Sequence, residues 1–196
     1  MTTPEDGREI FNLPNCITLL RLAVIPVLFL LLLSPGRSLS MVIAVLFILA
    51  SITDVIDGYV ARKFNIVTTM GKFLDPVADK LVVSVAMIMM IPIGRIPAWI
   101  VAVIIMRDIL VDGMRSVASA DGLIIDASRL GKQKTLCQIV AVSALLIHYD
   151  TVFGINAHVV GMVTLYLALV LTLWSGADYF KKFYKEKIAN RGQVFH

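Results

Sequence analysis

Charged residues are scarce in this sequence. Only 16% of the 196 residues are Asp, Glu, Lys or Arg, while 58% are hydrophobic; a soluble domain usually carries about 25% charged residues. Together with a mean hydropathy of +0.85, this composition argues against an ordinary soluble domain and predicts an integral membrane protein. The formal net charge of +4 is modest, and we expect no nucleic-acid partner.

Several other signals are missing. The two cysteines, Cys16 and Cys137, lie in apolar runs, so we expect packing residues and no disulfide. No small-residue cleavage site follows the first long apolar run, and we expect no cleavable signal peptide. Gly131-Lys132 lacks the earlier glycine and the adjacent Ser or Thr of a phosphate-binding P-loop. Without repeats or low-complexity segments, residues 1–196 are predicted to form one domain.

Long apolar runs are what the sequence has instead. Crossing the hydrocarbon takes roughly 20 apolar residues. We predict an all-α, polytopic membrane protein with six transmembrane helices, preceded by a short interfacial segment at Glu9–Asn15. The predicted spans are 16–33, 39–60, 68 or 69 to 91, 98–118, 132–147 and 159–173, the last continuing to about 179.

The basic residues are distributed unevenly along the chain. They gather in the connections after the second and fourth predicted spans and in the C-terminal tail, whereas no Lys or Arg lies between Ile147 and Val159. Lys and Arg are enriched in cytoplasmic loops. We therefore expect both termini to face the cytoplasm, with the tail lysines contacting anionic membrane lipid.

Four aspartates between residues 54 and 79 depart from this apolar background. Charged residues in a membrane segment are costly and usually functional. On a helix, Asp57, Gly58 and Ala61 fall on the same side as Asp54, and Asp79 lies one turn after Asp75. If the two segments form a hairpin, their acidic faces meet and repel unless cations lie between them. Carboxylate oxygens suit Mg²⁺, Mn²⁺ or Ca²⁺ and argue against zinc.

Such a cluster has an evident chemical use. Two divalent ions about 3.5–4 Å apart can hold a phosphoryl group for in-line attack. Arg62 is a cation for the phosphate oxygens, and the small residues Gly58 and Ala61 would let a ligand approach the helix backbone. Asp79, which lies farthest from the linker on its helix, is the candidate general base.

The same residues resemble the signature of the CDP-alcohol phosphatidyltransferase family: Asp, two residues, Asp-Gly, two residues, Ala-Arg, eight residues, Gly, three residues, Asp, three residues, Asp. This resemblance implies six membrane helices, two divalent cations (Mg²⁺ or Mn²⁺), and transfer of a phosphatidyl group from a CDP-linked lipid to an alcohol with release of CMP. It also implies a homodimer. By resemblance, Asp54, Asp57, Asp75 and Asp79 bind metal, Asp79 is also the base, and Gly58, Ala61, Arg62 and Gly71 shape the CDP-lipid site, with Arg62 on the diphosphate.

Further motifs look like the bacterial members that make phosphatidylglycerophosphate in the inner (cytoplasmic) membrane. These are residues 12–15, 17–18, 20–21, 74–80 and 131–135. The resemblance implies CDP-diacylglycerol and sn-glycerol 3-phosphate as substrates. Arg107, Arg115, Lys132 and Lys134 are candidates to bind the acceptor phosphate. Members of that group usually have Arg-Glu where this chain has Arg107-Asp108.

Other interpretations stay open at this point. The acceptor could be inositol phosphate, serine or another alcohol, and the Asp cluster could instead bind the coupling cation of a transporter or belong to an inactive scaffold. Arg62 could anchor the helix at the membrane surface. Arg107 and Arg115 could pair with Asp108 and Asp112, and Lys132 and Lys134 could be ordinary cytoplasmic charges. His148 and His158 are expected to be interfacial rather than catalytic.

Overall fold

Helices form almost all of the described chain. The computed structural model describes residues 13–64, 69–121, 129–149, 151–152 and 154–193. The predicted all-α class is confirmed there, apart from a two-stranded antiparallel hairpin that pairs Thr151 with Asn156. The elements are α2 (Leu13–Leu31), α3 (Arg37–Phe64), α4 (Thr69–Met90), α5 (Ala98–Ala120), α6 (Arg129–Ile147), β1 (Thr151–Val152), β2 (Ile155–Asn156) and α7 (Ala157–Gln193).

Each predicted span corresponds to one of these helices. The spans predicted to end at Leu33 and Ile91 run slightly past the ends of α2 and α4, and the largest difference is at the C-terminus. We expected a polar tail after about residue 179, but α7 continues to Gln193. The tail contains Lys and Glu, which favour helix, and Lys182 Nζ lies 2.9 Å from Asp178 Oδ2 one turn earlier. Of the predicted interfacial segment, residues 13–15 begin α2, and residues 9–12 lie outside the described residues.

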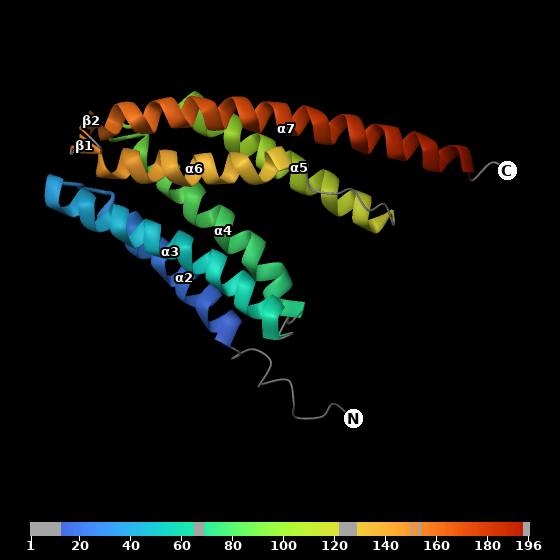
Figure 1. Ribbon diagram of the computed structural model, residues 1–196, viewed down its shortest axis with the longest axis horizontal. Coiled ribbons are helices and arrows are strands. Elements are labelled where there is room, and N and C mark those ends of the chain that lie inside the picture. Colours follow the sequence, from blue (N-terminus) through green and yellow to red (C-terminus); the bar gives the residue numbers. More distant parts are fainter. Residues whose placement is uncertain (1–12, 65–68, 122–128, 150, 153, 194–196) are drawn as a thin grey trace.

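The helices form two groups that diverge from a common end (Figure 1). One group contains α2, α3 and α4, and the other contains α5, α6 and α7. They meet where the turns after α2 and α4 and the hairpin β1–β2 lie, and α3 and α4 both contact α6 there. The ends of α3 and α5, after which the sequence predicts cytoplasmic connections, lie at the opposite, open ends of the two groups.

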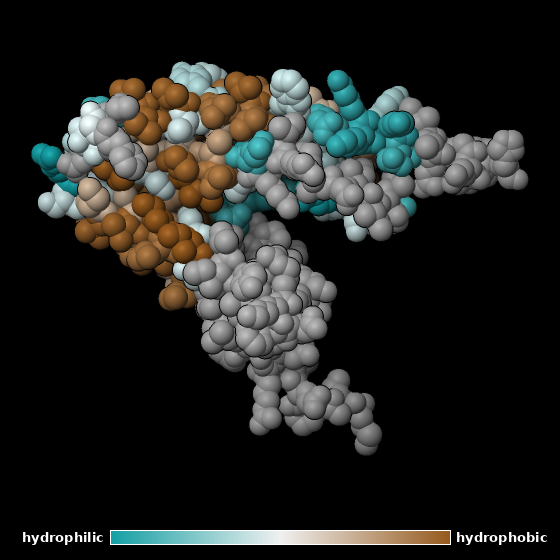
Figure 2. All heavy atoms as spheres, in the orientation of Figure 1, coloured by the Kyte–Doolittle hydropathy of each residue, from teal (hydrophilic) through white to brown (hydrophobic). Residues whose placement is uncertain are grey.

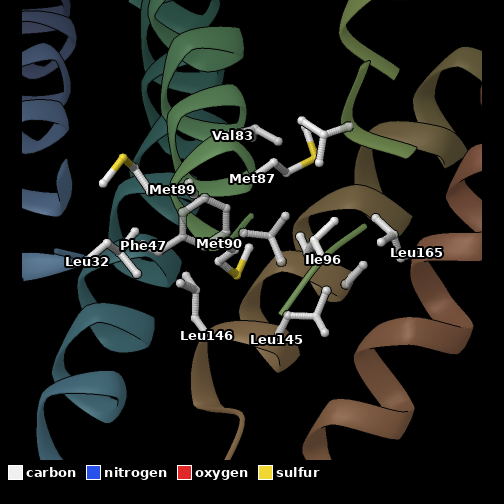
Figure 3. Close-up of a cluster of buried hydrophobic side chains, with 14 of the residues drawn as sticks. Leu32, Phe47, Val83, Met87, Met89, Met90, Ile96, Leu145, Leu146 and Leu165 are labelled. Atoms are coloured by element: carbon white, nitrogen blue, oxygen red, sulfur yellow. The ribbon is translucent and has the colours of Figure 1, made fainter. Parts of the chain in front are cut away.

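The core lies near the common end. Phe47 from α3, Met90 from α4 and Leu145 from α6 are fully buried and approach one another in Figure 3. Gly161 allows α7 to pack closely against α6, because a Cβ there would lie 2.5 Å from Leu145 Cγ. Burial of these side chains joins the two groups of helices.

Arg95, in the turn before α5, stabilises the same end of the molecule. Its side chain is 2% exposed. Nη1 donates a 2.9 Å hydrogen bond to the carbonyl of Leu146, and Nη2 donates a 2.7 Å bond to Ser40 Oγ. The guanidinium thus satisfies a carbonyl at the end of α6 that has no partner within its own helix, and it ties this helix to α3.

The outer faces of the helices are apolar. Leu20 and Leu30 in α2, Ile109 in α5 and Val163 in α7 are each about two-thirds exposed, and hydrophobic atoms cover much of the surface near the common end (Figure 2). In a soluble monomer, large exposed apolar patches are rare. This surface agrees with the predicted membrane location.

Length and hydropathy identify a single membrane-crossing candidate among the described helices, Ala157–Lys187 in α7. Shorter apolar segments are Leu19–Leu31, Arg37–Thr53 and Gln133–Ile147. Six transmembrane helices therefore remain a prediction.

Candidate active site

A cavity of about 460 Å³ lies between α4, α5, α6 and α7. Every wall contributes polar side chains. They include Asp79 and Lys80 from α4; Arg107, Asp108, Asp112 and Arg115 from α5; Lys134 and Gln138 from α6; and Ser175 and Tyr179 from α7. Three of the four predicted acceptor contacts, Arg107, Arg115 and Lys134, thus line one cavity together with the predicted base.

Arg107 is held by its own helix, α5, and by α7. Its Nη1 donates a 3.1 Å hydrogen bond to Asp108 Oδ1, and its Nη2 donates a 2.7 Å bond to Ser175 Oγ on α7. The stem lies against Gly176, where a Cβ would be 3.0 Å from Arg107 Nε. Pairing with Asp108 was an open interpretation of Arg107, and it occurs without removing Arg107 from the cavity.

Lys134 is the most deeply buried cation of the cavity. Its side chain is 7% exposed and forms an ion pair with Asp108. Asp108 therefore contacts both Lys134 and Arg107, so one carboxylate faces two cations. A buried cation needs such a partner. This burial is unlike that of an ordinary cytoplasmic surface lysine.

The mouth of the cavity carries a second set of charges. Lys80 pairs with Asp112, and both side chains are about 40% exposed. The guanidinium carbon of Arg115 lies 5.8 Å from the centre of the Tyr179 ring, a cation–π distance. Helix spacing had suggested that Asp112 could pair with Arg115, but Asp112 instead forms an ion pair with Lys80.

The acidic cluster of the sequence lies on α3 and α4, which contact each other. Asp54 and Asp57 are in the last third of α3, and Asp75 and Asp79 are one turn apart on α4. The predicted helical spacings within each pair are therefore confirmed. The side chains of Asp54, Asp57 and Asp75 lie outside the described part of the structure, and the meeting of the two acidic faces stays a prediction.

The predicted CDP-lipid residues follow the same helices. Gly58, Ala61 and Arg62 lie in α3, and Gly71 is the third residue of α4, one turn before Asp75. Their surroundings are not among the described contacts, and the same holds for the side chain of Lys132 in α6. Among the described residues there is no group of three or more His, Cys, Asp or Glu that could hold a metal, because only Asp79 of the four aspartates is described to its side chain.

Sequence reasoning missed Gln138, Ser175 and Tyr179, which line the cavity, and Gly176, which lies against the stem of Arg107. Gln138 is one turn after Lys134 on the same helix, which was a usable signal. The other three lie on α7, where nothing in the sequence indicated a contact with Arg107 or Arg115. Cys137, which we expected to be buried, also lies on α6 and is a partly exposed free thiol.

Comparison with known proteins agrees with this arrangement. Residues 11–174 match the family model described as CDP-alcohol phosphatidyltransferase. The chain is 46% identical to the CDP-diacylglycerol–glycerol-3-phosphate 3-phosphatidyltransferase of Bacillus subtilis, over 88% of this chain and 95% of that one. It is 40% identical to the protein of that name from Rickettsia typhi (87% and 96%), and 36% identical to the probable phosphatidylglycerophosphate synthase of Mycobacterium tuberculosis (90% and 86%). The match extends over most of the chain, which therefore belongs to the CDP-alcohol phosphatidyltransferase family.

Proposed function

We propose that this protein transfers a phosphatidyl group from CDP-diacylglycerol to sn-glycerol 3-phosphate, giving phosphatidylglycerophosphate and CMP. The names of the similar bacterial proteins support both substrates. The observation that carries the proposal is the cavity, because it combines the predicted general base with buried cations in a space suited to a small phosphorylated alcohol.

The charges of the cavity fit an acceptor with a phosphate. Lys80, Arg107, Arg115 and Lys134 supply four positive charges, and Asp108 and Asp112 offset two of them. If Asp79 serves the reaction, an excess of two positive charges remains. A phosphate monoester carries about −1.5 to −2 charges near neutral pH. Serine, with its ammonium group and no phosphate, suits this cavity less well.

In the proposed reaction, a carboxylate oxygen of Asp79 accepts the proton of the acceptor's primary hydroxyl. The hydroxyl oxygen then forms a bond to the phosphorus on the lipid side of the diphosphate. The bond from that phosphorus to the bridging oxygen breaks, and CMP leaves with the electron pair. Arg62 contacts the diphosphate, and Gly58, Ala61 and Gly71 leave room for the nucleotide. The cationic cavity holds the acceptor phosphate, so catalysis depends mainly on positioning and charge stabilisation.

Divalent cations complete the proposed site. The family generally depends on them, and the donor set fits, because Asp54, Asp57, Asp75 and Asp79 offer only carboxylate oxygens, which Mg²⁺ and Mn²⁺ prefer. The helical spacings on α3 and α4 support two acidic faces. Two bound cations would neutralise charge on the diphosphate during transfer.

The same proposal places the whole chain, residues 1–196, in the inner membrane of a bacterium as one domain with six spans. Support comes from the contrast in Figure 2 between the hydrophobic surface near the hairpin β1–β2 and the hydrophilic side chains toward the C-terminal part of α7. Both termini and the active site would face the cytoplasm. A homodimer is proposed on the family resemblance.

An acceptor panel tests the proposal. The purified protein, with CDP-diacylglycerol and Mg²⁺ or Mn²⁺, is given labelled sn-glycerol 3-phosphate, inositol phosphate or serine, and release of CMP and the labelled lipid product are measured. We expect product with glycerol 3-phosphate. Product with only another acceptor would reassign the substrate. Solute flux in liposomes without CMP release would favour the transporter interpretation. Absence of both solute flux and CMP release would favour an inactive scaffold.

A substitution at Asp79 tests the assigned base. We expect Asp79→Asn to lower turnover at least about 100-fold, within the range for loss of a general base, while most CDP-lipid binding is retained. Asp121→Asn is the matched control, because Asp121 is an exposed carboxylate that pairs with Lys187 outside the cavity. Near-normal turnover by Asp79→Asn would contradict the assignment.

A further inference from the structure

Gln138 is a buried amide that the proposed reaction does not yet use. The residue is 4% exposed, and its Nε2 is buried without a hydrogen-bond partner among the described residues. Buried polar groups are rarely left unsatisfied, and each exception calls for an explanation. Gln138 also lines the cavity between α4, α5, α6 and α7. A ligand bound in this cavity would supply the missing hydrogen-bond partner of Nε2.

The position of Gln138 within the cavity is set by the chain order of the lining residues. It is the last residue that α6 contributes, Met87 is the last from α4, and Ile105 is the first from α5. These helices run in alternating directions, so the three residues share the inner end of the cavity, away from its charged mouth. Ser175, the first residue that α7 contributes, lies toward the same end, and its hydroxyl accepts the hydrogen bond of Arg107. The amide of Gln138 lies beside the apolar side chains of Met87 and Ile105, where an unpaired donor is costly.

Lys134 lies one turn before Gln138 on the same face of α6. The lysine and Arg107 supply charge for a phosphate, whereas the neutral amide supplies a hydrogen-bond donor without charge. A three-carbon phosphorylated alcohol is long enough to span the rise of one helical turn, about 5.4 Å. The two side chains thus match two different groups of the same acceptor, its phosphate and a hydroxyl.

We infer that Gln138 determines acceptor specificity by donating a hydrogen bond from Nε2 to the non-reacting secondary hydroxyl of sn-glycerol 3-phosphate. This inference rests on the proposed function. A site built to hydrogen-bond a substrate hydroxyl discriminates against the analogue that lacks it, because the buried protein group is then left unpaired. Gln138 therefore acts on the choice of acceptor, and CDP-diacylglycerol is recognised elsewhere.

The test compares two acceptors that differ only at this hydroxyl, sn-glycerol 3-phosphate and 3-hydroxypropyl phosphate. The enzymes are wild type, Gln138→Leu and Gln138→Met, the last keeping the length of the side chain if the leucine variant does not accumulate. Gln133→Leu is the matched control, because Gln133 is an exposed glutamine on the same helix. Initial rates of CMP release give kcat/KM for each acceptor.

We expect the kcat/KM of wild type and Gln133→Leu to be about tenfold higher with sn-glycerol 3-phosphate than with 3-hydroxypropyl phosphate. The Gln138 variants should lose most of this preference, because their kcat/KM falls with sn-glycerol 3-phosphate and stays nearly unchanged with 3-hydroxypropyl phosphate. An unchanged ratio in the Gln138 variants, including an equal loss with both acceptors, would overturn the inference, since it would indicate a structural or phosphate-binding role. A wild-type enzyme without preference would overturn it as well. If wild type used neither phosphate acceptor but released CMP with another alcohol, the proposed function itself would fail.

Discussion

Gly176 offers the sharpest test of how the cavity is built. A methyl group at this position would lie 3.0 Å from Arg107 Nε and 3.2 Å from its Cγ, so in Gly176→Ala the arginine must move by a few tenths of an ångström. Its bond to Asp108 is already 3.1 Å long, and such a shift would bring it close to the limit for a hydrogen bond. Hydrogen bonds to charged groups contribute about 1.5–3 kcal/mol. The same shift moves the guanidinium away from its proposed position on the acceptor phosphate, and loss of roughly 1 kcal/mol from that charged hydrogen bond corresponds to about fivefold weaker acceptor binding.

The assay is steady-state kinetics with each substrate varied in turn. We expect Gly176→Ala to raise KM for sn-glycerol 3-phosphate about fivefold and to leave KM for CDP-diacylglycerol nearly unchanged. Gly113→Ala is the matched control, because nothing lies within 4 Å of its added Cβ; replacing a helical glycine there should stabilise the protein by about 0.5–1 kcal/mol. Gly161→Ala should instead lower thermal stability, by about 1–3 kcal/mol, through overpacking against Leu145. Equal effects of Gly176→Ala on both KM values would refute the reasoning.

Three further predictions follow from the described contacts. Lys134→Met should raise KM for the acceptor at least about tenfold through loss of a charged hydrogen bond, with the exposed Lys182→Met as control; a change confined to KM for the CDP-lipid would contradict it. Arg95→Ala should lower the free energy of unfolding by about 2–4 kcal/mol, measured by thermal unfolding in detergent, because Ser40 and the Leu146 carbonyl lose a buried partner; an unchanged melting temperature would contradict this. Burial and, to a smaller extent, the charges of Arg95 and His158 lower the pKa of His148 in the folded protein. In the unfolded chain a histidine has a pKa of about 6.5, so the unfolded chain binds a proton more readily than the folded one. Stability should therefore fall as the pH drops below about 6.5, and His148→Asn, which tolerates the φ of 51° found there, should reduce that fall; an identical pH profile would contradict the assignment.

The helices themselves could be predicted because their signal is local. Apolar runs separated by Pro, Gly and charged residues predicted α2 to α6 to within a few residues at most ends. The end of α7 was missed because membrane-length reasoning stops where apolar residues stop, although Lys and Glu continue a helix well in water. The spacings of Asp54 with Asp57, and of Asp75 with Asp79, are equally local, and both pairs are helical as expected.

The walls of the cavity could be predicted only in part. Sequence reasoning selected Arg107, Arg115 and Lys134 by charge and by side of the membrane. Helix spacing offered Asp108 to Arg107 and Asp112 to Arg115, and of these two pairs the structure shows the first. Asp112 contacts Lys80, which is 32 residues away, and Asp108 contacts Lys134 as well as its neighbour Arg107. Such pairs depend on how α4, α5 and α6 pack, and nothing in their local sequence encodes that packing.

The contribution of α7 shows most clearly why tertiary packing decides the site. Ser175 and Gly176 look like an ordinary pair of small residues in an apolar helix, a pattern that in membranes usually indicates close helix contact. Here the close contact is with the side chain of Arg107: the serine accepts its hydrogen bond and the glycine leaves room for its stem. The pattern predicts that something approaches α7 closely, and only the packing of α5 against α7 shows that the approaching group is a guanidinium. The position of Arg107, a proposed phosphate-binding residue, is thus set by a helix that contributes no charge of its own at this point. Substitutions at Gly176 should therefore weaken acceptor binding.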